Sequence, residues 1–456
     1  MSRAPRKPRE AALEALLRVD GEGVTPQSAL ETEWAGTETP KRDRALATEL
    51  VYGSLRRRNA LDWVLAKLAR RPLDEVQPRV LWILRLGAYQ LLYLDRIPDH
   101  AAVDEAVRQA SGHGHKGITG FVNGVLRNMA RGLADGSLAL PGREDGLETY
   151  LAVTESHPEW LVRRWLSELG PEQTEAICRL DNEPAPTCVR ANRLKNDRVE
   201  LAAGLRSEGV TVTEMALAPD GLTIDDYSSL PELATFREGR FFVQDEAAML
   251  VAPLLAPRPG ETLVDACSAP GGKATHLAEL TGDQARIVAV ELVREKLPQI
   301  AENCRRLGLT GVAPVQGDAR RLPELAPGPI DGVLVDAPCS GLGVLRRRPD
   351  SRWRKRPEDP AALAPLQLAL LDAAAKTVVA GGRIVYSTCT IAGTENEEVV
   401  RAFLAAHPDF RPADLRPFLP AALREEPGAA AGALQLLPSR HGTDGFFLAR
   451  FDRDRT

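Results

Sequence analysis

The feature that most constrains the fold is a series of short apolar runs after Gly239, which helical patterns separate: TLVDA, IVAVE, VAPVQ, GVLVDA and RIVYST. Short runs rich in β-branched residues that alternate with helices predict a parallel sheet with helices on both of its faces. Ligands of such a sheet bind beyond the carboxyl ends of its strands. We therefore expect an α/β domain over residues 236–456 whose functional side chains directly follow these runs.

The part of the chain before residue 236 predicts two further domains. From about Pro8 to Met129, apolar residues recur at every third or fourth position, which is the pattern of amphipathic helices. A helix around Trp160 then precedes short strand-like runs such as TCVRAN and LTIDD. We expect an all-helical domain over residues 1–140 and a small α+β subdomain over residues 150–235. A chain of 456 residues is long enough to bury several cores.

Composition and cysteine spacing exclude several classes of protein. Hydrophobic residues make up 44% and charged residues 27% of the chain, which is typical of globular proteins. The first residues, MSRAPRKPREAALEAL, lack the apolar core of an export signal, and Arg85 interrupts the most apolar stretch, VLWILRLGAYQLLYL. Six cysteines without a CxxC pair predict neither a disulfide framework nor a zinc site. We expect free thiols in a cytoplasmic protein that has no metal and no membrane span.

The net charge of −5 means that any binding of nucleic acid must depend on a local basic patch. One run of seven cations also contains Trp353 and a single acid, Asp350; the cations are Arg346, Arg347, Arg348, Arg352, Arg354, Lys355 and Arg356. Cations for phosphates beside an aromatic ring for stacking form a composition that is used on RNA. The alternative interpretation is an ordinary solvated loop.

The segment ETLVDACSAPGGKATHLAEL predicts a strand, a glycine turn and a helix, with Asp265 at the end of the strand. Glycine is needed where the backbone approaches a ligand closely. Two further acids, Glu291 and Asp318, end other strands, where they suit ribose hydroxyls and an adenine amine. The turn is not GxGxxG, and acids attract a sulfonium, so we expect a cationic ligand that contains adenosine. The alternative for each acid is an ordinary strand-end or helix-capping carboxylate.

Two cysteines follow predicted strands and so fall on the ligand side of the sheet. Cys339 comes after GVLVDA, and Cys389 comes after RIVYST. Both share this edge with Asp336 and Lys273, and we expect these four residues to form the catalytic group. The buried-filler interpretation, which is usual for cysteine, is kept for Cys178, Cys188 and Cys304.

A thiol in this position suits methylation of carbon 5 of cytosine, an atom that is not nucleophilic by itself. A thiolate that adds to carbon 6 makes carbon 5 enamine-like, so that it can attack a methyl group. A proton or hydrogen bond at ring nitrogen 3 assists the addition, and Asp336 is the candidate. A second thiol can assist the loss of the first. The residues alone leave open which of Cys339 and Cys389 attacks.

A set of motifs from about residue 150 to the end resembles the RNA cytosine-5 methyltransferases of the Sun/Nop2 family: DACSAPGGK, VQGDAR, VDAPCSGLG, PDSRW, YSTCT with ENEE, and DGFFLARF. Before them, RDRALATELVYG and FVNGVLRNMAR resemble a NusB-type RNA-binding domain, which in bacteria is fused to the family member that acts on 16S ribosomal RNA. The resemblance implies a Rossmann-like domain, dependent on S-adenosylmethionine, with a mixed seven-stranded sheet.

The resemblance also implies a role for each matching residue. The cofactor loop comprises Cys267, Ser268, Ala269, Pro270, Gly271, Gly272 and Lys273. Glu291, Asp318 and Asp336 contact S-adenosylmethionine. Cys389 is the nucleophile, and Cys339 assists product release. Two residues depart from the family pattern, because Glu291 replaces a more usual aspartate and Ala274 stands where threonine or serine is frequent.

The implied activity is methylation of carbon 5 of one cytosine in 16S ribosomal RNA, by a monomer that acts on naked RNA or on early assembly intermediates. The same chemistry on transfer RNA or 23S ribosomal RNA is an alternative, and the target nucleotide is not specified. A non-catalytic RNA-binding or antitermination protein would need the helical domain alone. A thiol oxidoreductase is disfavoured because the chain has no CxxC motif.

Overall fold

The chain contributes to its first structural unit at two separate places. The computed structural model describes residues 6–112, 116–326 and 328–455. One unit runs to Pro184 and includes the later segment Leu345–Lys355, and the other comprises Ala185–Val344 and Arg356–Thr456. The inserted segment therefore begins shortly after Cys339 in the sequence.

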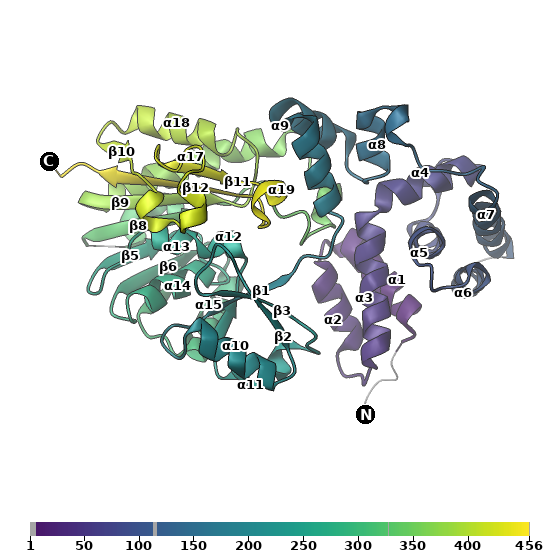
Figure 1. Ribbon diagram of the computed structural model, residues 1–456, viewed down its shortest axis with the longest axis horizontal. Helices are drawn as coiled ribbons and strands as arrows, with labels where there is room; N and C mark the ends of the chain where they lie inside the picture. Colours follow the sequence, from purple (N-terminus) through teal and green to yellow (C-terminus); the bar gives the residue numbers. More distant parts are fainter. Residues whose placement is uncertain (1–5, 113–115, 327, 456) are drawn as a thin grey trace. The chain divides into compact units, whose positions relative to one another are not determined.

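The first unit is helical, as its apolar periodicity predicts, and Figure 1 labels its helices. Their bounds are α1 Pro8–Glu22, α2 Pro26–Trp34, α3 Lys41–Arg56, α4 Arg58–Leu68, α5 Pro78–Tyr93, α6 Asp99–Ser111, α7 Lys116–Ala134, α8 Leu147–Val153 and α9 Glu159–Leu180. The apolar stripes of α1, α3, α4, α5 and α7 share one core. Trp82 of α5 is fully buried there, and its indole N–H donates to Asp20 at 2.8 Å.

A small antiparallel sheet opens the second unit, with the strand order β2-β3-β1-β4. Its elements are β1 Thr187–Ala191, α10 Arg198–Ser207, β2 Thr211–Glu214, β3 Gly221–Asp225, α11 Ala234–Arg237 and β4 Phe241–Val243. Phe241 and Leu201 lie in the core between this sheet and α10. The fourth strand lies just beyond residue 235, so the sheet also uses the segment that the sequence pattern assigned to the next domain.

The second sheet of this unit is mixed, as expected, with seven strands in the order β10-β12-β9-β8-β5-β6-β7 and an eighth, β11, paired to β12. The bounds are β5 Thr262–Asp265, β6 Arg286–Glu291, β7 Val312–Gln316, β8 Ile330–Asp336, β9 Val378–Thr388, β10 Phe410–Pro412, β11 Ala433–Leu436 and β12 Phe446–Arg453. The five runs predicted as strands are β5 to β9, and these pair in parallel. β12 joins β9 antiparallel.

Helices cover both faces of this sheet, and successive strand residues pack into different hydrophobic cores. Ile287 of β6 packs with Leu277 and Ile300 on one face, whereas Val288 packs with Leu370 on the other. The helices are α12 Glu246–Met249, α13 Val251–Leu254, α14 Gly272–Leu280, α15 Leu297–Leu307, α16 Leu322–Leu325, α17 Asp359–Thr377, α18 Glu397–Ala406 and α19 Pro438–His441. Figure 1 shows α17 and α18 on the opposite side of the sheet from α13 and α14.

The strand order reverses between β5 and β8, since β6 and β7 extend the sheet on one side and β9 on the other. Ligands of open parallel sheets bind at such a switch point, beyond the carboxyl ends of the strands. Asp265 and Asp336 are the last residues of β5 and β8. Within the described part of the chain, no helix has the length and apolarity to cross a membrane.

Candidate active site

The sequence-predicted acids lie along one edge of the large sheet. Asp265, Glu291 and Asp336 end neighbouring strands, while Asp318 and Cys389 follow the ends of β7 and β9. The four acids all lie close enough to Cys267, in the loop after β5, to affect the pKa of its thiol. Burial raises the pKa of the Cys267 thiol, and four carboxylates raise it further, those of Asp265, Asp336, Glu291 and Asp318. The edge is therefore strongly acidic before any ligand binds.

The glycine turn is required by backbone geometry and packing. Gly271 has φ of 99°, and a β-carbon there would lie 3.3 Å from the side chain of Ile300. A β-carbon on Gly272 would lie 3.1 Å from the ring of Phe242. The backbone N–H of Ser268 donates to the carbonyl of Val290 at 2.9 Å, which ties the loop to β6. These contacts place the loop from Cys267 to Lys273 over the end of the strands.

Two of the acids also hold local structure. Glu291 accepts hydrogen bonds from the backbone of Val293 at 2.9 Å and of Ala269 at 3.3 Å, so it fixes the loop from Cys267 to Lys273. Asp318 caps the short turn Ala319–Arg321 and accepts from the backbone of Arg320 at 3.0 Å. Hydrogen bonds from Arg320 lower the pKa of Asp318. The capping alternative is thus present at Asp318, whose carboxylate also pairs with the Arg320 guanidinium, whereas each Glu291 oxygen accepts one hydrogen bond and retains a lone pair for a ligand.

Asp265 is the acid with the fewest contacts. It is fully buried, and among the described residues neither carboxylate oxygen makes a hydrogen bond of normal length and angle. Burial raises the pKa of Asp265 to about 7, although the Lys273 ammonium, the Ser268 hydroxyl and the backbone N–H of Ala274 oppose the rise. Buried polar atoms without such hydrogen bonds are rare in folded proteins and point to donors from a ligand or water. The resemblance assigned no role to Asp265, so this observation comes from the structure alone.

Lys273 and Asp336 form an ion pair at the switch point. The ammonium donates to Asp336 Oδ2 at 2.7 Å, and the Ser387 hydroxyl donates to Oδ1 at 2.8 Å. Burial alone would lower the pKa of Lys273, but the Asp336 carboxylate more than offsets this effect and raises it. Lys273 also lies 5.3 Å from the ring centre of Phe446, a cation–π contact.

The two strand-end thiols meet. The Sγ atoms of Cys339 and Cys389 lie 3.3 Å apart, and both residues are free cysteines. The hydrogen bond from Cys339 lowers the pKa of Cys389; burial opposes this shift, whereas Lys273 assists it. The pKa of Cys339 is raised well above its ordinary value by the hydrogen bond to Cys389 and by burial. The shifts therefore favour the thiolate at Cys389, beside Lys273, and the thiol at Cys339.

The structure adds residues from the ENEE motif that sequence reasoning did not assign. Glu395 and Asn396 are fully buried, whereas Glu397 and Glu398 are exposed. Asn396 accepts from the Thr388 hydroxyl at 2.6 Å and donates to the Thr390 carbonyl at 3.1 Å, so it brackets Cys389. An acidic pattern alone could not indicate which members face inward.

The cysteines away from this edge remain structural. Cys178, Cys188 and Cys304 are buried. Burial raises the pKa of Cys304 to about 11, which disfavours its reactive thiolate form. In the ranges that the structure describes, no group of three or more histidine, cysteine or carboxylate side chains could hold a metal ion.

The basic run from Arg346 to Arg356 is not a uniform RNA-facing patch, and its prediction is wrong for Arg352. This side chain is fully buried in the first unit. Its guanidinium donates to the carbonyl oxygens of Ser156 at 2.8 Å and Arg56 at 3.2 Å. It also donates to the carbonyl of Asp181 at 3.0 Å and to the side chain of Asn182 at 3.1 Å. Only tertiary structure reveals these acceptors.

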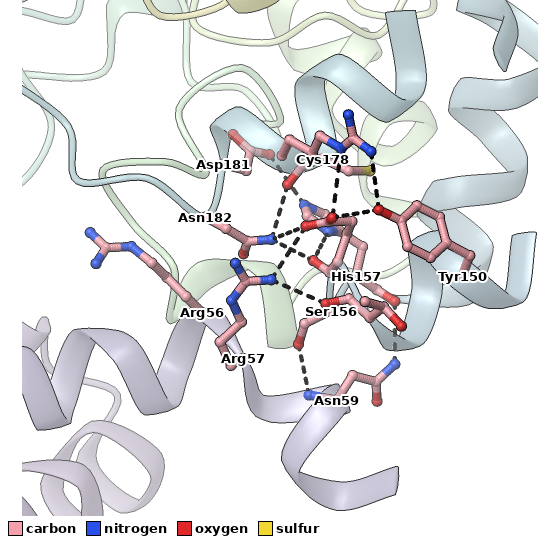
Figure 2. A network of polar contacts seen from close by, with 12 residues as sticks. Arg56, Arg57, Asn59, Tyr150, Ser156, His157, Cys178, Asp181 and Asn182 are labelled. Atoms are coloured by element: carbon pink, nitrogen blue, oxygen red, sulfur yellow. Dashed lines mark hydrogen bonds and ion pairs between the residues drawn. The ribbon is translucent and has the colours of Figure 1, made fainter. Parts of the chain in front are cut away.

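The acceptors of Arg352 belong to a wider polar network (Figure 2). In it, the backbone N–H of Asn59 donates to the Ser156 hydroxyl at 2.8 Å, and the Asn182 side chain donates to the carbonyl of Glu155 at 2.8 Å. Trp353 contributes its indole N–H to the carbonyl of Leu55 at 2.7 Å. The segment after the Cys339 loop is thus held inside the helical unit. The exposed cations of the run are Arg348, Arg354 and Arg356.

Comparison with protein families identifies three parts of the chain. Residues 252–452 match the family 16S rRNA methyltransferase RsmB/F. Residues 6–131 match the NusB family, and residues 157–230 match the ferredoxin-like domain of RsmF/B-like methyltransferases. The predicted NusB-type domain and methyltransferase domain are confirmed.

Whole-length relatives and solved structures agree with these matches. The chain is 42% identical over 442 residues to the probable ribosomal RNA small subunit methyltransferase B of Bacillus subtilis, a match that covers 96% of this chain and 97% of the relative. It is 38% identical to ribosomal RNA small subunit methyltransferase B of Pseudomonas syringae, with 97% and 96% of the two chains covered.

Among solved structures, PH0851 is 29% identical and superposes with a TM-score of 0.84, with 99% of this chain and 100% of that chain covered. NSun6 from Pyrococcus horikoshii, crystallised with SFG, is 25% identical, with a TM-score of 0.58 and coverage of 66% and 99%. On this similarity, the chain belongs to the 16S rRNA methyltransferase RsmB/F family.

Proposed function

We propose that this protein transfers the methyl group of S-adenosylmethionine to carbon 5 of a cytosine in 16S ribosomal RNA, with Cys389 as nucleophile. The observation that carries the proposal is the pair of thiols 3.3 Å apart at the sheet's switch point, of which Cys389 has the lowered pKa. A thiolate is the form of cysteine that attacks an electrophilic carbon. Lys273 and Asp336 lie near enough to this thiol to affect its pKa, and they would bind the base.

The cofactor would lie over the acidic edge. S-adenosylmethionine supplies a methyl group activated on a positively charged sulfur. The loop from Cys267 to Lys273 would cradle it, with Glu291 for the ribose hydroxyls, Asp318 for the adenine amine and Asp336 close to the sulfonium. The carboxylate of Asp265, which makes no hydrogen bond of normal length and angle, supports this placement, because a ligand's ammonium or hydroxyl would satisfy it. The related NSun6 structure, which was determined with SFG, also supports it.

The first chemical step forms a bond between Cys389 Sγ and carbon 6 of the cytosine. The electron pair of the 5,6 double bond shifts toward the ring nitrogen, where a proton is needed at nitrogen 3. Asp336 would contact nitrogen 3, and its carboxylate accepts a hydrogen bond from the Lys273 ammonium at 2.7 Å. The proton can therefore pass from Lys273 through Asp336 to the ring. Carbon 5 is then nucleophilic and would bond to the methyl carbon as the bond from that carbon to the sulfonium sulfur breaks, with S-adenosylhomocysteine as the leaving group.

The second step restores the aromatic ring. The proton on carbon 5 leaves to water, and its electron pair re-forms the 5,6 double bond as the bond from carbon 6 to Cys389 Sγ breaks. Nitrogen 3 returns its proton through Asp336 to Lys273. Cys389 departs as a thiolate. Cys339, which keeps its proton, donates a hydrogen bond to the departing sulfur and so stabilises the leaving group. The cytosine must be flipped or splayed from its neighbours for both faces of the ring to be reached.

The choice of small-subunit RNA over transfer RNA or 23S RNA is supported by the names of the full-length relatives. A purely RNA-binding or antitermination role is disfavoured, since it gives no function to two adjacent thiols whose pKa values are shifted in opposite directions.

Bisulfite sequencing of ribosomal RNA from cells with and without this protein tests the proposal. We expect one 16S cytosine to resist conversion in the parent cells and to be converted in the deletion. Re-expression of the parent protein should restore resistance, whereas re-expression of Cys389→Ala should not. Identical conversion of every 16S cytosine in parent and deletion cells would rule out the proposed target.

A further inference from the structure

Glu395 is a fully buried carboxylate that the mechanism above does not use. Its Oε1 accepts hydrogen bonds from the backbone N–H of Ser340 at 2.8 Å and from the side chain of Gln367 at 2.9 Å. Its Oε2 accepts from the Ser340 hydroxyl. Three donors therefore face its two oxygens, and the side chain acts as an acceptor in every one of these hydrogen bonds.

These contacts connect the segments that carry the two thiols. Ser340 directly follows Cys339, and Thr390 directly follows Cys389. The hydroxyl oxygens of Ser340 and Thr390 lie 2.9 Å apart, so Thr390 can donate to Ser340 while Ser340 donates to Glu395. Through Ser340, the carboxylate thus sets the position of one thiol relative to the other.

Gln367 of α17 adds a second support to the Cys339 loop. Its side-chain amide donates to the carbonyl of Pro338 at 3.0 Å as well as to Glu395. The residues on both sides of Cys339 are therefore held, Pro338 by Gln367 and Ser340 by Glu395. Tyr386 fixes the backbone of Glu395 itself, because its hydroxyl donates to the Glu395 carbonyl at 2.6 Å.

The charges around the two sulfurs are asymmetric. Lys273 lowers the pKa of Cys389, against the effects of burial, Asp336 and Asp444. The hydrogen bond to Cys389 and burial raise the pKa of Cys339 most, and Glu395 and Asp336 raise it further. The Lys273 cation thus acts on Cys389 and the Glu395 carboxylate on Cys339, while Asp336 acts on both.

We propose that Glu395 is the positioning residue that aims Cys339 at Cys389 and keeps the Cys339 thiol protonated, so that Cys339 can donate a hydrogen bond to the departing sulfur. The inference rests on the proposed function, since it assigns Glu395 to the release step of that reaction. Glu395 does not touch substrate or cofactor and acts only through Cys339. Its loss should slow release and leave the addition to carbon 6 in place.

The test uses full-length protein with a 16S RNA transcript and methyl-labelled S-adenosylmethionine. Glu395→Gln leaves the side-chain volume almost unchanged but replaces one accepting oxygen with an amide NH2 group. This group then faces hydrogen-bond donors and no acceptor. We expect release of methylated RNA to slow by about tenfold or more, and a denaturant-resistant protein–RNA adduct to accumulate. The alkaline limb of the release rate should move to lower pH, because Cys339 then loses its proton more easily. Glu395→Asp, which keeps the charge, should recover part of the rate.

Three comparisons make the result decisive. Glu398→Gln, an exposed glutamate in the same motif, should release product at the parent rate. In a Cys339→Ala background, Glu395→Gln should slow release only slightly further. If it slows release by the same factor as in the parent background, Glu395 does not act through Cys339. Ser340→Ala removes only the hydroxyl link and should accumulate less adduct than Glu395→Gln. This variant keeps the inference testable if Glu395→Gln does not fold. Parent-like release and no adduct in both variants would overturn the inference.

Cys389→Ala in the same assay separates the two levels of proposal. Methyl transfer by Cys389→Ala would overturn the proposed function itself. If Cys389→Ala is inactive and Cys339→Ala accumulates adduct while folded Glu395→Gln behaves as the parent, only the role of Glu395 fails.

Discussion

The Sγ atom of Cys389 lies 3.3 Å from the Sγ atom of Cys339, and the hydrogen bond between them lowers the pKa of Cys389. Cys389→Ala removes the thiolate that adds to carbon 6, so methyl transfer should fall by a factor on the order of a thousand or more. Transfer of labelled methyl to a 16S transcript measures this loss. Cys304→Ala, which removes a buried thiol on α15, is the control and should retain activity. Substantial transfer by Cys389→Ala would place the nucleophile elsewhere.

Cys339→Ala should separate addition from release. The variant keeps Cys389 and can still form the bond to carbon 6, but it lacks the proton-bearing thiol beside the departing sulfur. We expect a covalent protein–RNA complex that survives denaturing electrophoresis and disappears in the double variant with Cys389→Ala. A Cys339→Ala protein that turns over without such a complex would remove Cys339 from the release step.

Lys273→Met should shift the reactivity of Cys389 to higher pH. The Lys273 ammonium lowers the pKa of Cys389, and Asp336, which Lys273 neutralises at 2.7 Å, would raise it. Loss of the ammonium therefore raises the pKa through both effects, so the thiolate forms only at more alkaline pH. The rate of iodoacetamide alkylation at Cys389, followed by mass spectrometry across pH, checks this shift. Lys296→Met, at an exposed position, should leave the profile unchanged, and an equal profile in Lys273→Met would contradict the electrostatic role.

The strands and the positions of the thiols could be predicted because both depend on local pattern. A short apolar run that ends in a polar residue places Asp336 or Cys389 at a strand end whatever the rest of the chain does. The proposed ranking of the thiols depends instead on the contact between them and on the charges of Lys273 and Glu395, which come from other segments. Only tertiary structure brings these charges to one thiol or the other, so sequence reasoning had to take the ranking from family resemblance.

The wrong assignment of Arg352 has a similar physical origin. Seven cations in a short run predict a solvated or RNA-bound surface, because a charge is costly to bury without partners. The partners of Arg352 are backbone carbonyl oxygens of Arg56, Ser156 and Asp181, and side-chain identity carries no information about such acceptors. Asp265 shows the converse, since its strand-end position was evident and its lack of hydrogen bonds of normal length and angle was not.

Arg352→Met should destabilise the helical unit. It leaves the carbonyl oxygens of Arg56, Ser156 and Asp181 buried without this donor. The cost in free energy of unfolding should be about 3 kcal/mol or more, since each unsatisfied buried group costs about 1–3 kcal/mol. Urea unfolding followed by tryptophan fluorescence measures it. Arg348→Met, at an exposed position in the same segment, should change the stability by less than about 0.5 kcal/mol. Equal stability of the two variants would contradict the buried role.

The exposed cations of the basic run are the ones that remain candidates for phosphate contacts. Arg348 and Arg356 are exposed, whereas Arg346 is half-buried and pairs with Glu183 at 3.3 Å. Each phosphate contact to single-stranded RNA contributes about 0.7 to the slope of log K against log salt. Arg348→Gln combined with Arg356→Gln should therefore weaken binding of a 16S transcript and flatten this slope by about 1.4.

Arg346→Gln is the matched control for the salt experiment, because Glu183 and the Pro184 carbonyl already hold its guanidinium. Its slope should equal that of the parent. Filter binding across a salt series measures all three proteins at one temperature, and circular dichroism checks that each is folded. A parent-like slope in the double variant would mean that Arg348 and Arg356 are solvated and that RNA phosphates are held by other cations.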